Sequence, residues 1–372
     1  MKALLLCSEP VDYAIAVANG VADHAEVTAI FPQSRYGHLR EWIDPRIRLD
    51  LVDWPRTRSL SNPAFLWRLT RSIRAVAPDV LHVLSNTTLW LNAAVPFWRG
   101  IPLVTTVHDV MMHPGDRETA QLPGWGSRLM VRQSPDLVVH GEGLREAAAR
   151  TFGVDPARIH VVPHPAIRRY ADLAAREGLR RSRPAGEFTV LLFGRIFAYK
   201  GLATLLQAEA SLRDTIPGLR LVIAGRGDDP AELSTLMGDP ARYDIRRGFV
   251  EDRDVAQLFV DADVVVLPYT EASQSGVLHV AATFGKPVVV TDVGELRATV
   301  ESAGLGLVVP PEAPEALGQA LRALAADPET RARLGRNAQA WSEGDDSPST
   351  IGARTVALYQ EILTRRAAAS PN

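Results

Sequence analysis

The chain of 372 residues has a single cysteine, Cys7, inside its first apolar run. One cysteine excludes an intrachain disulfide and any metal site built from cysteines, and it fits a reducing compartment. No apolar run approaches the roughly 18 residues of a membrane span. The apolar stretch after Met1 and Lys2 has only five residues, too few for the core of a signal peptide. We therefore expect a cytoplasmic protein.

Net charge is small, and no stretch of the chain is densely basic. The formal charge is −2. Residues 1–183 hold 23 basic against 18 acidic residues, and residues 184–372 hold 18 against 25. A mildly basic first half fits an anionic acceptor or membrane surface, although chance arrangement is the more frequent explanation. Because the sequence has no dense run of basic residues and no nucleic-acid-recognition motif, nucleic-acid binding is unsupported.

What the chain does have is a regular alternation of strand-like and helix-like segments. Such alternation predicts parallel sheets covered by helices on both faces. The pattern occurs twice in a chain too long for one core, so we expect an α/β protein with two doubly wound, Rossmann-like domains. The predicted strands are residues 3–7, 27–31, 47–52, 80–83, 103–107, 137–139 and 159–162, then 188–193, 219–224, 245–248, 264–267, 287–291 and 306–309.

The expected domain boundary lies between residues 183 and 184. The stretch 179–186 is polar, carries Pro and Gly, and precedes the first strand of the second domain. A second break at 343–348 ends that domain near residue 346, and a last helix follows within 347–372. The tail from Arg365 onward is expected to fray.

The loop after the strand 188–193 carries two cations beside a helix start. Arg195 and Lys200 follow Gly194 at the carboxyl end of this strand, and a helical pattern begins at Leu202. Ligands bind at that edge of open α/β sheets, and helix N-termini favour anions there. The two cations would hold a diphosphate and stabilise the charge that grows on it as it leaves. A surface Arg and Lys near a helix start is the common alternative.

A second polar loop follows the strand 264–267 and opens another helix. Gln274, Ser275 and Gly276, together with the first N–H groups of the helix, would form an anion cradle. Glu271 supplies a carboxylate that can bind sugar hydroxyls. An ordinary serine N-cap is the alternative, and capping is compatible with ligand binding.

Three other strand ends carry weaker signals. Gly225 opens a Gly-x-Gly turn, which lacks the third glycine of the dinucleotide-binding motif. This turn fits either a position near a bound nucleotide or an ordinary connection from a strand to a helix. Backbone groups near Val250 could read a nucleobase edge. His108 could exchange a hydrogen bond with a sugar hydroxyl while Asp109 orients it, or it could simply be a structural histidine.

Two other features of the chain are given no catalytic role. Asp261 and Asp263 resemble a metal-binding acid pair, but they stand at the entry of a strand, so no metal site is expected there. His164 lies where the chain crosses between the expected domains.

The first half also contains six of the seven tryptophans. Arg68, Arg71 and Arg74 accompany Trp67 on one predicted helix, which fits weak peripheral membrane contact or a lipid-acceptor surface. Core packing of the aromatic residues is the more frequent explanation. The polar loop 111–127 is long enough to act as an acceptor lid.

Taken together, these segments resemble the retaining glycosyltransferases of family 4. The resemblance rests on segments in the family's order and spacing: Val107-His108-Asp109, Val161 to Pro163, Phe193-Gly194-Arg195 through Lys200-Gly201, Ile223 to Gly225 and Gly285 to Val289. It implies a GT-B fold, in which two Rossmann-like domains face each other across a cleft. It also implies a donor in the second domain, an acceptor in the first, and a last helix that packs back on the first.

The same resemblance implies roles for individual residues. Arg195 and Lys200 would bind the donor diphosphate, and His108 would lie beside the donor sugar. The amides of Gly276 and Val277 would cap a phosphate.

The chain departs from the family in two places. The family usually has two glutamates separated by seven residues, of which Glu271 matches the first, whereas His279 stands in place of the second. In the family, the second glutamate normally binds the ribose of the nucleotide. The Ser-Gln-Ser-Gly sequence of this loop resembles the version found in a subset of the family. A glycine-rich loop after the first strand is also missing, and Asp12 and Tyr13 would shape the acceptor side there.

We expect a metal-independent retaining glycosyltransferase that needs no cofactor. Its donor would be a nucleotide sugar, with UDP favoured over GDP, and its acceptor a saccharide, a lipid-linked saccharide or a small molecule. Another GT-B enzyme, such as a sugar-nucleotide epimerase or a pseudo-glycosyltransferase, is an alternative. A non-catalytic sugar-nucleotide sensor is another. A nicotinamide dehydrogenase is least supported, because neither domain opens with the required glycine pattern.

Overall fold

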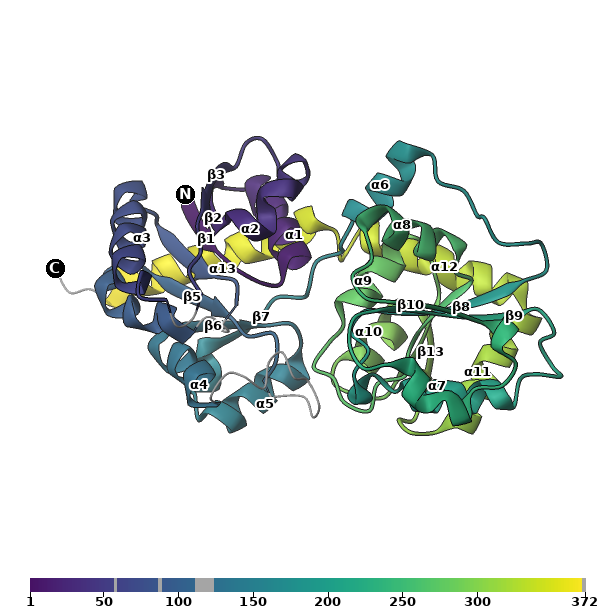
Figure 1. Ribbon diagram of the computed structural model, residues 1–372. Helices are drawn as coiled ribbons and strands as arrows, with labels where there is room; N and C mark the ends of the chain where they lie inside the picture. The colour runs from purple at the N-terminus through teal and green to yellow at the C-terminus, as the bar shows by residue number, and fades with distance from the viewer. Residues whose placement is uncertain (57–58, 86–88, 111–123, 370–372) are drawn as a thin grey trace. The chain divides into compact units, whose positions relative to one another are not determined.

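The protein divides into two units, each built around one parallel sheet (Figure 1). The structure, a computed structural model, describes residues 1–56, 59–85, 89–110 and 124–369. Within these, unit 1 contains residues 1–110, 124–165 and 345–369, and unit 2 contains residues 166–344. Most of the predicted acceptor lid, residues 111–123, lies outside the described residues.

Unit 1 has a seven-stranded sheet in the order β3-β2-β1-β4-β5-β6-β7, with all neighbouring strands parallel. The order reverses between β1 and β4, and ligands of open α/β sheets bind at the carboxyl ends of strands at such a point. The strands are β1 (Lys2–Leu6), β2 (Glu26–Pro32), β3 (Arg48–Val52), β4 (Val80–Val83), β5 (Leu103–Thr106), β6 (Asp136–Val139) and β7 (Ile159–Val161).

Helices cover both faces of this sheet because its central strand is apolar on both sides. Ala3 and Leu5 of β1 face one core, and Leu4 and Leu6 face the other. The first core contains α1 and α13, and the second contains α3. The helices are α1 (Val11–Ala22), α2 (Gln33–Tyr36), α3 (Asn62–Val76), α4 (Gly124–Gln133), α5 (Glu142–Phe152) and α13 (Pro348–Ala369).

Unit 2 has a six-stranded parallel sheet in the order β10-β9-β8-β11-β12-β13, which reverses between β8 and β11. Its strands are β8 (Phe188–Phe193), β9 (Leu219–Gly225), β10 (Tyr243–Arg247), β11 (Val264–Leu267), β12 (Val288–Thr291) and β13 (Gly306–Val309). Its helices are α6 (Arg169–Glu177), α7 (Leu202–Ala210), α8 (Asp252–Asp261), α9 (Gly276–Thr283), α10 (Leu296–Ala303), α11 (Pro314–Ala326) and α12 (Pro328–Glu343).

The prediction of two doubly wound parallel sheets is confirmed, but the chain passes between the units earlier than the sequence suggests. The division falls after Pro165, not after residue 183. The reason is α6, which packs on α8 of unit 2. Arg169 of α6 forms an ion pair with Asp252 at 2.5 Å and donates a hydrogen bond to the Tyr170 hydroxyl.

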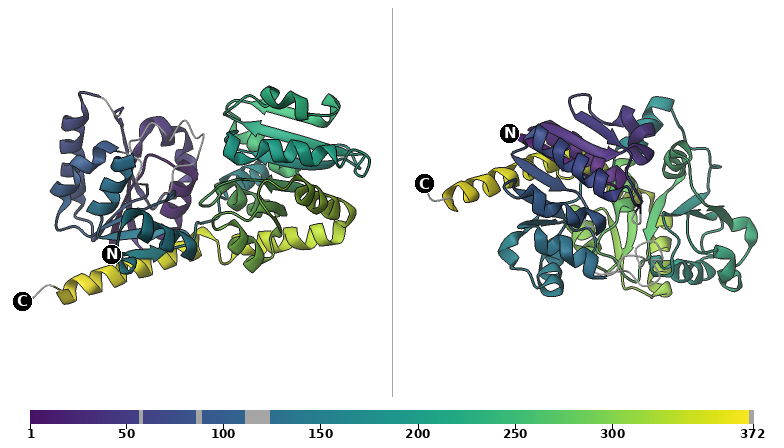
Figure 2. Two further views of the ribbon diagram at one scale, coloured as in Figure 1. Left: turned by 90° about the horizontal axis from the view of Figure 1, so that it is seen from below. Right: turned by 60° about the vertical axis from the view of Figure 1, so that its left-hand side comes forward.

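The expected fraying of the C-terminal tail is wrong for residues 365–369. Helix α13 continues to Ala369, and Figure 2 shows it, in yellow, running along unit 1. Arg365 pairs with the buried carboxylate of Asp136, which also contacts His160 at 2.9 Å. This pairing of a buried charge fixes the end of the helix. No helix in the described ranges is both long and apolar enough to cross a bilayer.

Two glycines allow α1 and α13 to touch. A Cβ on Gly20 would lie 1.8 Å from the Pro348 carbonyl oxygen, and a Cβ on Gly352 would lie 2.0 Å from the Gly20 carbonyl oxygen. Both distances are much shorter than a van der Waals contact. The backbones of α1 and α13 can therefore approach this closely only because glycine stands at both positions.

We predict that Gly352→Ala lowers the free energy of unfolding by about 1–3 kcal/mol, because the added methyl group must push two packed backbones apart. Urea denaturation measures the change. Arg354→Ala, on the exposed side of the same helix, is the matched control. Equal stability of both variants and the wild type would show that the contact tolerates a side chain.

Candidate functional site

The loops that follow β8 and β11 are locked together at the reversal point of the unit 2 sheet. Gly201 ends the first loop with φ +70°, and a Cβ there would lie 1.7 Å from the Pro268 carbonyl oxygen. The backbone N–H of Thr270 donates to the Tyr199 carbonyl at 2.9 Å. The two loops that carry the predicted cations and the predicted anion cradle therefore form one rigid surface.

Lys200 lies against Tyr269 on this surface, and the positive charge of Arg195 acts on the same tyrosine. The Lys200 Nζ is 3.7 Å from the centroid of the Tyr269 ring, and such cation–π contacts hold an ammonium group in place. Burial raises the pKa of Tyr269 to about 12, whereas its bond with Ser275 and the positive charge of Arg195 act in the opposite direction. The Tyr269 hydroxyl is 3.0 Å from Ser275 Oγ. The structure thus brings together both predicted cations and Ser275.

Ser275 is also the N-cap residue of α9, but its side chain makes no capping bond, since its hydroxyl lies at Tyr269. The backbone N–H groups of the first helical turn, which starts at Gly276 and Val277, have no partner further back in the helix. Such N–H groups at a helix start favour an anion. The ordinary side-chain cap that the sequence also allows is not formed.

Two acceptor atoms of the same loop are buried without a hydrogen-bond partner among the described residues. They are Oε2 of Glu271 and Oε1 of Gln274. An unsatisfied buried acceptor costs about 1–3 kcal/mol, and proteins rarely keep one without a role. These two oxygens could accept hydrogen bonds from the hydroxyl groups of a ligand.

Glycines bring the neighbouring strand ends close to these loops. Gly194, with φ +119°, has open space except for Val277, whose Cγ2 would be 3.6 Å from an added Cβ. Gly225, with φ +146°, would place a Cβ 1.6 Å from the Gly194 carbonyl oxygen. The weak Gly-x-Gly signal therefore marks a backbone contact between the β8 and β9 loops. Val250 lies half-buried at the carboxyl side of β10, just before α8.

His279, which stands where the family usually has its second glutamate, packs inside unit 2. His279 is buried on α9, and its ring centroid is 5.4 Å from that of Trp341 on α12. The imidazole therefore fills space between two helices of unit 2, and the loop surface gains no carboxylate from this position.

The acid pair at the entry of β11 has structural partners. Asp261 accepts hydrogen bonds from the backbone N–H and the hydroxyl of Ser182 at 2.6 and 2.7 Å, and Asp263 pairs with Arg181 at 2.9 Å. Across the described ranges, no group of His, Cys, Asp and Glu is arranged to hold a metal ion.

In unit 1, the ring of His108 is held by two protein partners. Its Nε2 lies 2.8 Å from the Leu84 carbonyl oxygen, and its Nδ1 lies 3.2 Å from Nε2 of His140. The bond to His140 orients the ring in the way that the sequence analysis assigned to Asp109, an exposed residue. His140 was missed, although His108, His140 and His164 each follow the end of a strand, which was the available signal.

Tyr13 lies at the centre of these three histidines. Its ring centroid is 4.5 Å from His108, 5.1 Å from His140 and 5.0 Å from His164. Tyr13 is buried, so the residue predicted to shape the acceptor side packs beneath the surface, whereas Asp12 beside it is only half-buried.

A fourth histidine, His82, links β4 to α13. Its Nδ1 is 2.6 Å from the Tyr359 hydroxyl, and its Nε2 is 2.8 Å from Thr106 Oγ1. Burial, with a smaller contribution from the charge of His108, lowers the pKa of His82 to about 3. His82 is therefore neutral at physiological pH.

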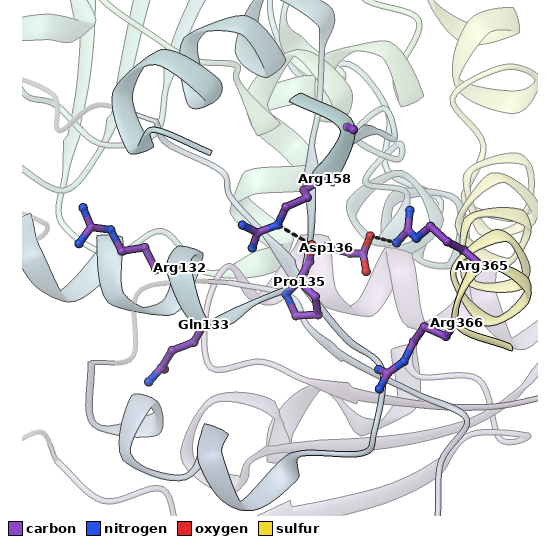
Figure 3. A pocket seen from close by; sticks show the side chains of 8 residues that line it. Arg132, Gln133, Pro135, Asp136, Arg158, Arg365 and Arg366 are labelled. Atoms are coloured by element: carbon purple, nitrogen blue, oxygen red, sulfur yellow. Dashed lines mark hydrogen bonds and ion pairs between the residues drawn. The ribbon is translucent and has the colours of Figure 1, made fainter. Parts of the chain in front are cut away.

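A cavity of about 620 Å³ opens at the amino end of β6, away from the strand ends described above (Figure 3). Arg158 donates to the Pro135 carbonyl at 2.9 Å, and Arg365 pairs with Asp136. Of the arginines that line the cavity, Arg158 is thus bonded to a backbone carbonyl and Arg365 to a buried carboxylate. Four arginines line it in all: Arg132, Arg158, Arg365 and Arg366.

Comparisons with known proteins agree with the arrangement of the strands and loops. Residues 12–166 match the family described as Glycosyltransferase Family 4, and residues 187–327 match Glycosyl transferases group 1. A D-inositol 3-phosphate glycosyltransferase of Xylanimonas cellulosilytica is 32% identical over 317 residues, which cover 78% of this chain and 73% of that protein. The alpha-D-kanosaminyltransferase of Streptomyces kanamyceticus is 27% identical over 275 residues, 71% of each chain.

A solved structure shows the same fold over nearly the whole chain. The Anabaena protein HepE, solved in complex with UDP-glucose, superposes with a TM-score of 0.72 at 18% identity and covers 97% of this chain and 100% of its own. At this identity the likeness concerns the fold.

We predict that the folded protein loses stability as the pH falls below about 6.5, the ordinary pKa of histidine. His82 has a lowered pKa in the folded state, so the unfolded chain takes up its proton first. The stability is present above pH 6.5 and declines toward pH 3, by up to about 1.4 kcal/mol per pH unit for one such group.

Urea denaturation at pH 7, 6 and 5 measures this slope. His82→Gln should flatten it, because glutamine does not titrate. His24→Gln removes an exposed imidazole from the same unit and serves as the control. An unchanged slope in His82→Gln would assign the pH dependence to another group.

Proposed function

Because this chain belongs to glycosyltransferase family 4, we propose that it transfers a sugar from a nucleoside-diphosphate sugar to an acceptor hydroxyl with retention of configuration. The observation that carries the proposal is the rigid surface at the reversal point of unit 2. Lys200 lies there against Tyr269, whose pKa also responds to the charge of Arg195. Ser275, which precedes the first N–H groups of α9, contacts the same tyrosine.

Unit 2 would bind the donor through its diphosphate and its sugar. Arg195, Lys200 and the amides of Gly276 and Val277 supply donors for phosphate oxygens. The buried oxygens of Glu271 and Gln274 would accept hydrogen bonds from sugar hydroxyls, which offsets the cost of burying them.

The nucleotide would lie along the neighbouring strand ends. Gly225 keeps the carboxyl end of β9 free of a side chain, and the backbone near Val250 would meet the base. Bound UDP-glucose in HepE, which has the same fold, supports a UDP-sugar first and a GDP-sugar second.

In the proposed transfer step, the main contribution of the protein is to place cations beside the departing diphosphate. The acceptor hydroxyl attacks the anomeric carbon on the face from which the diphosphate departs, and the carbon–oxygen bond to the phosphate breaks. The departing phosphate oxygen takes the hydroxyl proton. Arg195 and Lys200 offset the growing negative charge, so the proposed step uses neither a metal ion nor a separate base. Unit 1 would supply the acceptor side through Asp12, Tyr13 and Asp109, and His108 would lie beside the donor sugar.

Two alternatives use the same donor site. A GT-B epimerase or pseudo-glycosyltransferase would also bind a sugar nucleotide, and a sensor would bind it without turnover. The two sequence relatives named above are glycosyltransferases, which favours transfer. Product analysis with a labelled donor separates them: transfer yields a new glycoside, epimerisation changes the donor sugar without one, a pseudo-glycosyltransferase couples a non-sugar unit, and a sensor leaves the donor unchanged.

We predict that Lys200→Ala lowers turnover at least a hundredfold, because one preorganised donor to a developing anion contributes about 3 kcal/mol to the barrier. The fold should survive, since the lysine is half-buried on a loop. Steady-state kinetics with a UDP-sugar panel measures the rate, and circular dichroism checks the fold.

Lys200→Arg and Lys2→Ala are the controls for this experiment. The arginine variant keeps a charge but loses the compact ammonium group that fits against Tyr269, so it should restore only part of the rate. Lys2 is exposed at the start of unit 1, and its loss should leave the rate unchanged. Wild-type turnover in Lys200→Ala would remove this lysine from the mechanism.

A further part of the proposal is that unit 1 docks on an anionic lipid surface through α3. Trp67 is 63% exposed and Phe97 is 61% exposed, so core packing does not explain either aromatic residue. Arg71 lies over the Trp67 ring, and Arg74 donates to the Phe97 carbonyl at 2.9 Å. These four residues, called the α3 surface below, form one continuous strip.

The α3 surface combines the two features of a peripheral membrane contact. Exposed aromatic rings can enter the interface, and arginines attract anionic headgroups. Within the part of the chain that the structure describes, neither Arg71 nor Arg74 has an acidic ion-pair partner. By contrast, Arg145 and Arg150 on α5 pair with Glu142 and Glu146.

We predict that the protein sediments with anionic vesicles but not with neutral ones. Arg71→Ala combined with Arg74→Ala should weaken binding about tenfold to thirtyfold, because each arginine near the membrane contributes about 1 kcal/mol. Trp67→Ala with Phe97→Ala should also weaken it. Arg145→Ala with Arg150→Ala removes the same charge from α5 and should change little. Equal binding by all variants would contradict the proposed surface.

A further inference from the structure

The hydrogen bonds of His108 and His140 require three protons on the two rings. Nε2 of His108 faces the Leu84 carbonyl oxygen, and Nδ1 of His140 faces the Val162 carbonyl oxygen at 2.9 Å. A carbonyl oxygen only accepts, so each of these nitrogens must carry a hydrogen. The bond between the rings, at 3.2 Å, needs one more hydrogen. Two neutral imidazoles carry only two hydrogens in all.

We propose that His108 and His140 share one extra proton at neutral pH, and that His140 is the positioning residue that fixes the ring of His108. The pair then carries a single positive charge. Whichever ring holds the extra proton donates it to the facing nitrogen of the other ring.

The surroundings allow one charge on the pair and disfavour two. Burial lowers the pKa of His108, although its bond to Leu84 and the carboxylate of Asp109 act in the opposite direction. Both rings are equally buried, so burial disfavours a second charge without selecting one ring. The Tyr13 ring packs against both, with centroid distances of 4.5 Å to His108 and 5.1 Å to His140.

Other groups near the pair are neutral or act in opposite directions. His82 is uncharged at neutral pH, and burial raises the pKa of the Tyr13 hydroxyl far above neutrality. The amino end of α5, which begins at Glu142, opposes a cation at His140, while the Glu142 carboxylate itself favours one but is paired with Arg145. The ring centroid of His164 is 5.4 Å from that of His140.

The proton count is tested on the intact protein without substrate. Histidine labelled with ¹⁵N is observed by NMR at pH 7, with His108→Gln and His140→Gln used for assignment. We expect three of the four ring nitrogens of the pair to carry hydrogen, and one proton to leave the pair in a single step as the pH is raised. Two protonated nitrogens in the pair at pH 7 would overturn the shared charge.

The positioning role rests on the proposed function and has its own readout. Glutamine at position 140 can still donate to Nδ1 of His108 but cannot hold the charge, whereas phenylalanine can do neither. We expect His140→Phe to lower kcat at least tenfold, and His140→Gln to recover most of the rate while the alkaline limb of the kcat/KM profile disappears. His24→Gln, which removes an exposed imidazole of unit 1, is the control.

The outcomes separate this inference from the function itself. Wild-type rates and pH profiles in both His140 variants would overturn the positioning role, whatever the NMR result. If the wild type shows no transfer with any donor, the proposed function fails, and the NMR experiment still decides whether the pair holds three protons.

Discussion

The contact between the loops after β8 and β11 is the constraint on which the proposed donor site depends. A side chain on Gly201 would collide with Pro268, and one on Gly225 would collide with Gly194. Without side chains at these two positions, three strand ends meet closely enough for Lys200 to reach Tyr269. The site is therefore rigid before any ligand arrives, and preorganised charge of this kind is what stabilises a departing anion.

The two units share a doubly wound sheet topology but differ in the polar groups that lie at its reversal point. Both sheets reverse their order next to their first strand, and both collect polar side chains at the carboxyl ends there. Unit 2 gathers permanent cations and helix N–H groups, which suit a phosphate at any physiological pH. Unit 1 gathers imidazoles around a buried tyrosine, and their charge depends on how protons are shared. The units thus divide fixed charge and titratable charge between them.

Residues in short loops after apolar strands were within reach of the sequence. Arg195, Lys200 and Ser275 follow strands directly, and the parallel topology places such residues at one edge. His140 was not found because its role depends on the ring of His108, 32 residues earlier in the chain, and on the carbonyl of Val162 after β7. Trp67 was ambiguous for a similar reason, since helical periodicity alone does not say which side of a helix its neighbours cover.

The sequence by itself determined the class of fold, the number of units and the positions of the polar loops after β8 and β11, because alternation and strand-end chemistry are local properties. Only the tertiary structure decided where the chain passes between the units, which ring orients His108, and that His279 packs on Trp341. Each of these depends on side chains that meet from distant parts of the chain. The physical reason is that packing and hydrogen bonding between such groups have no pattern along the sequence.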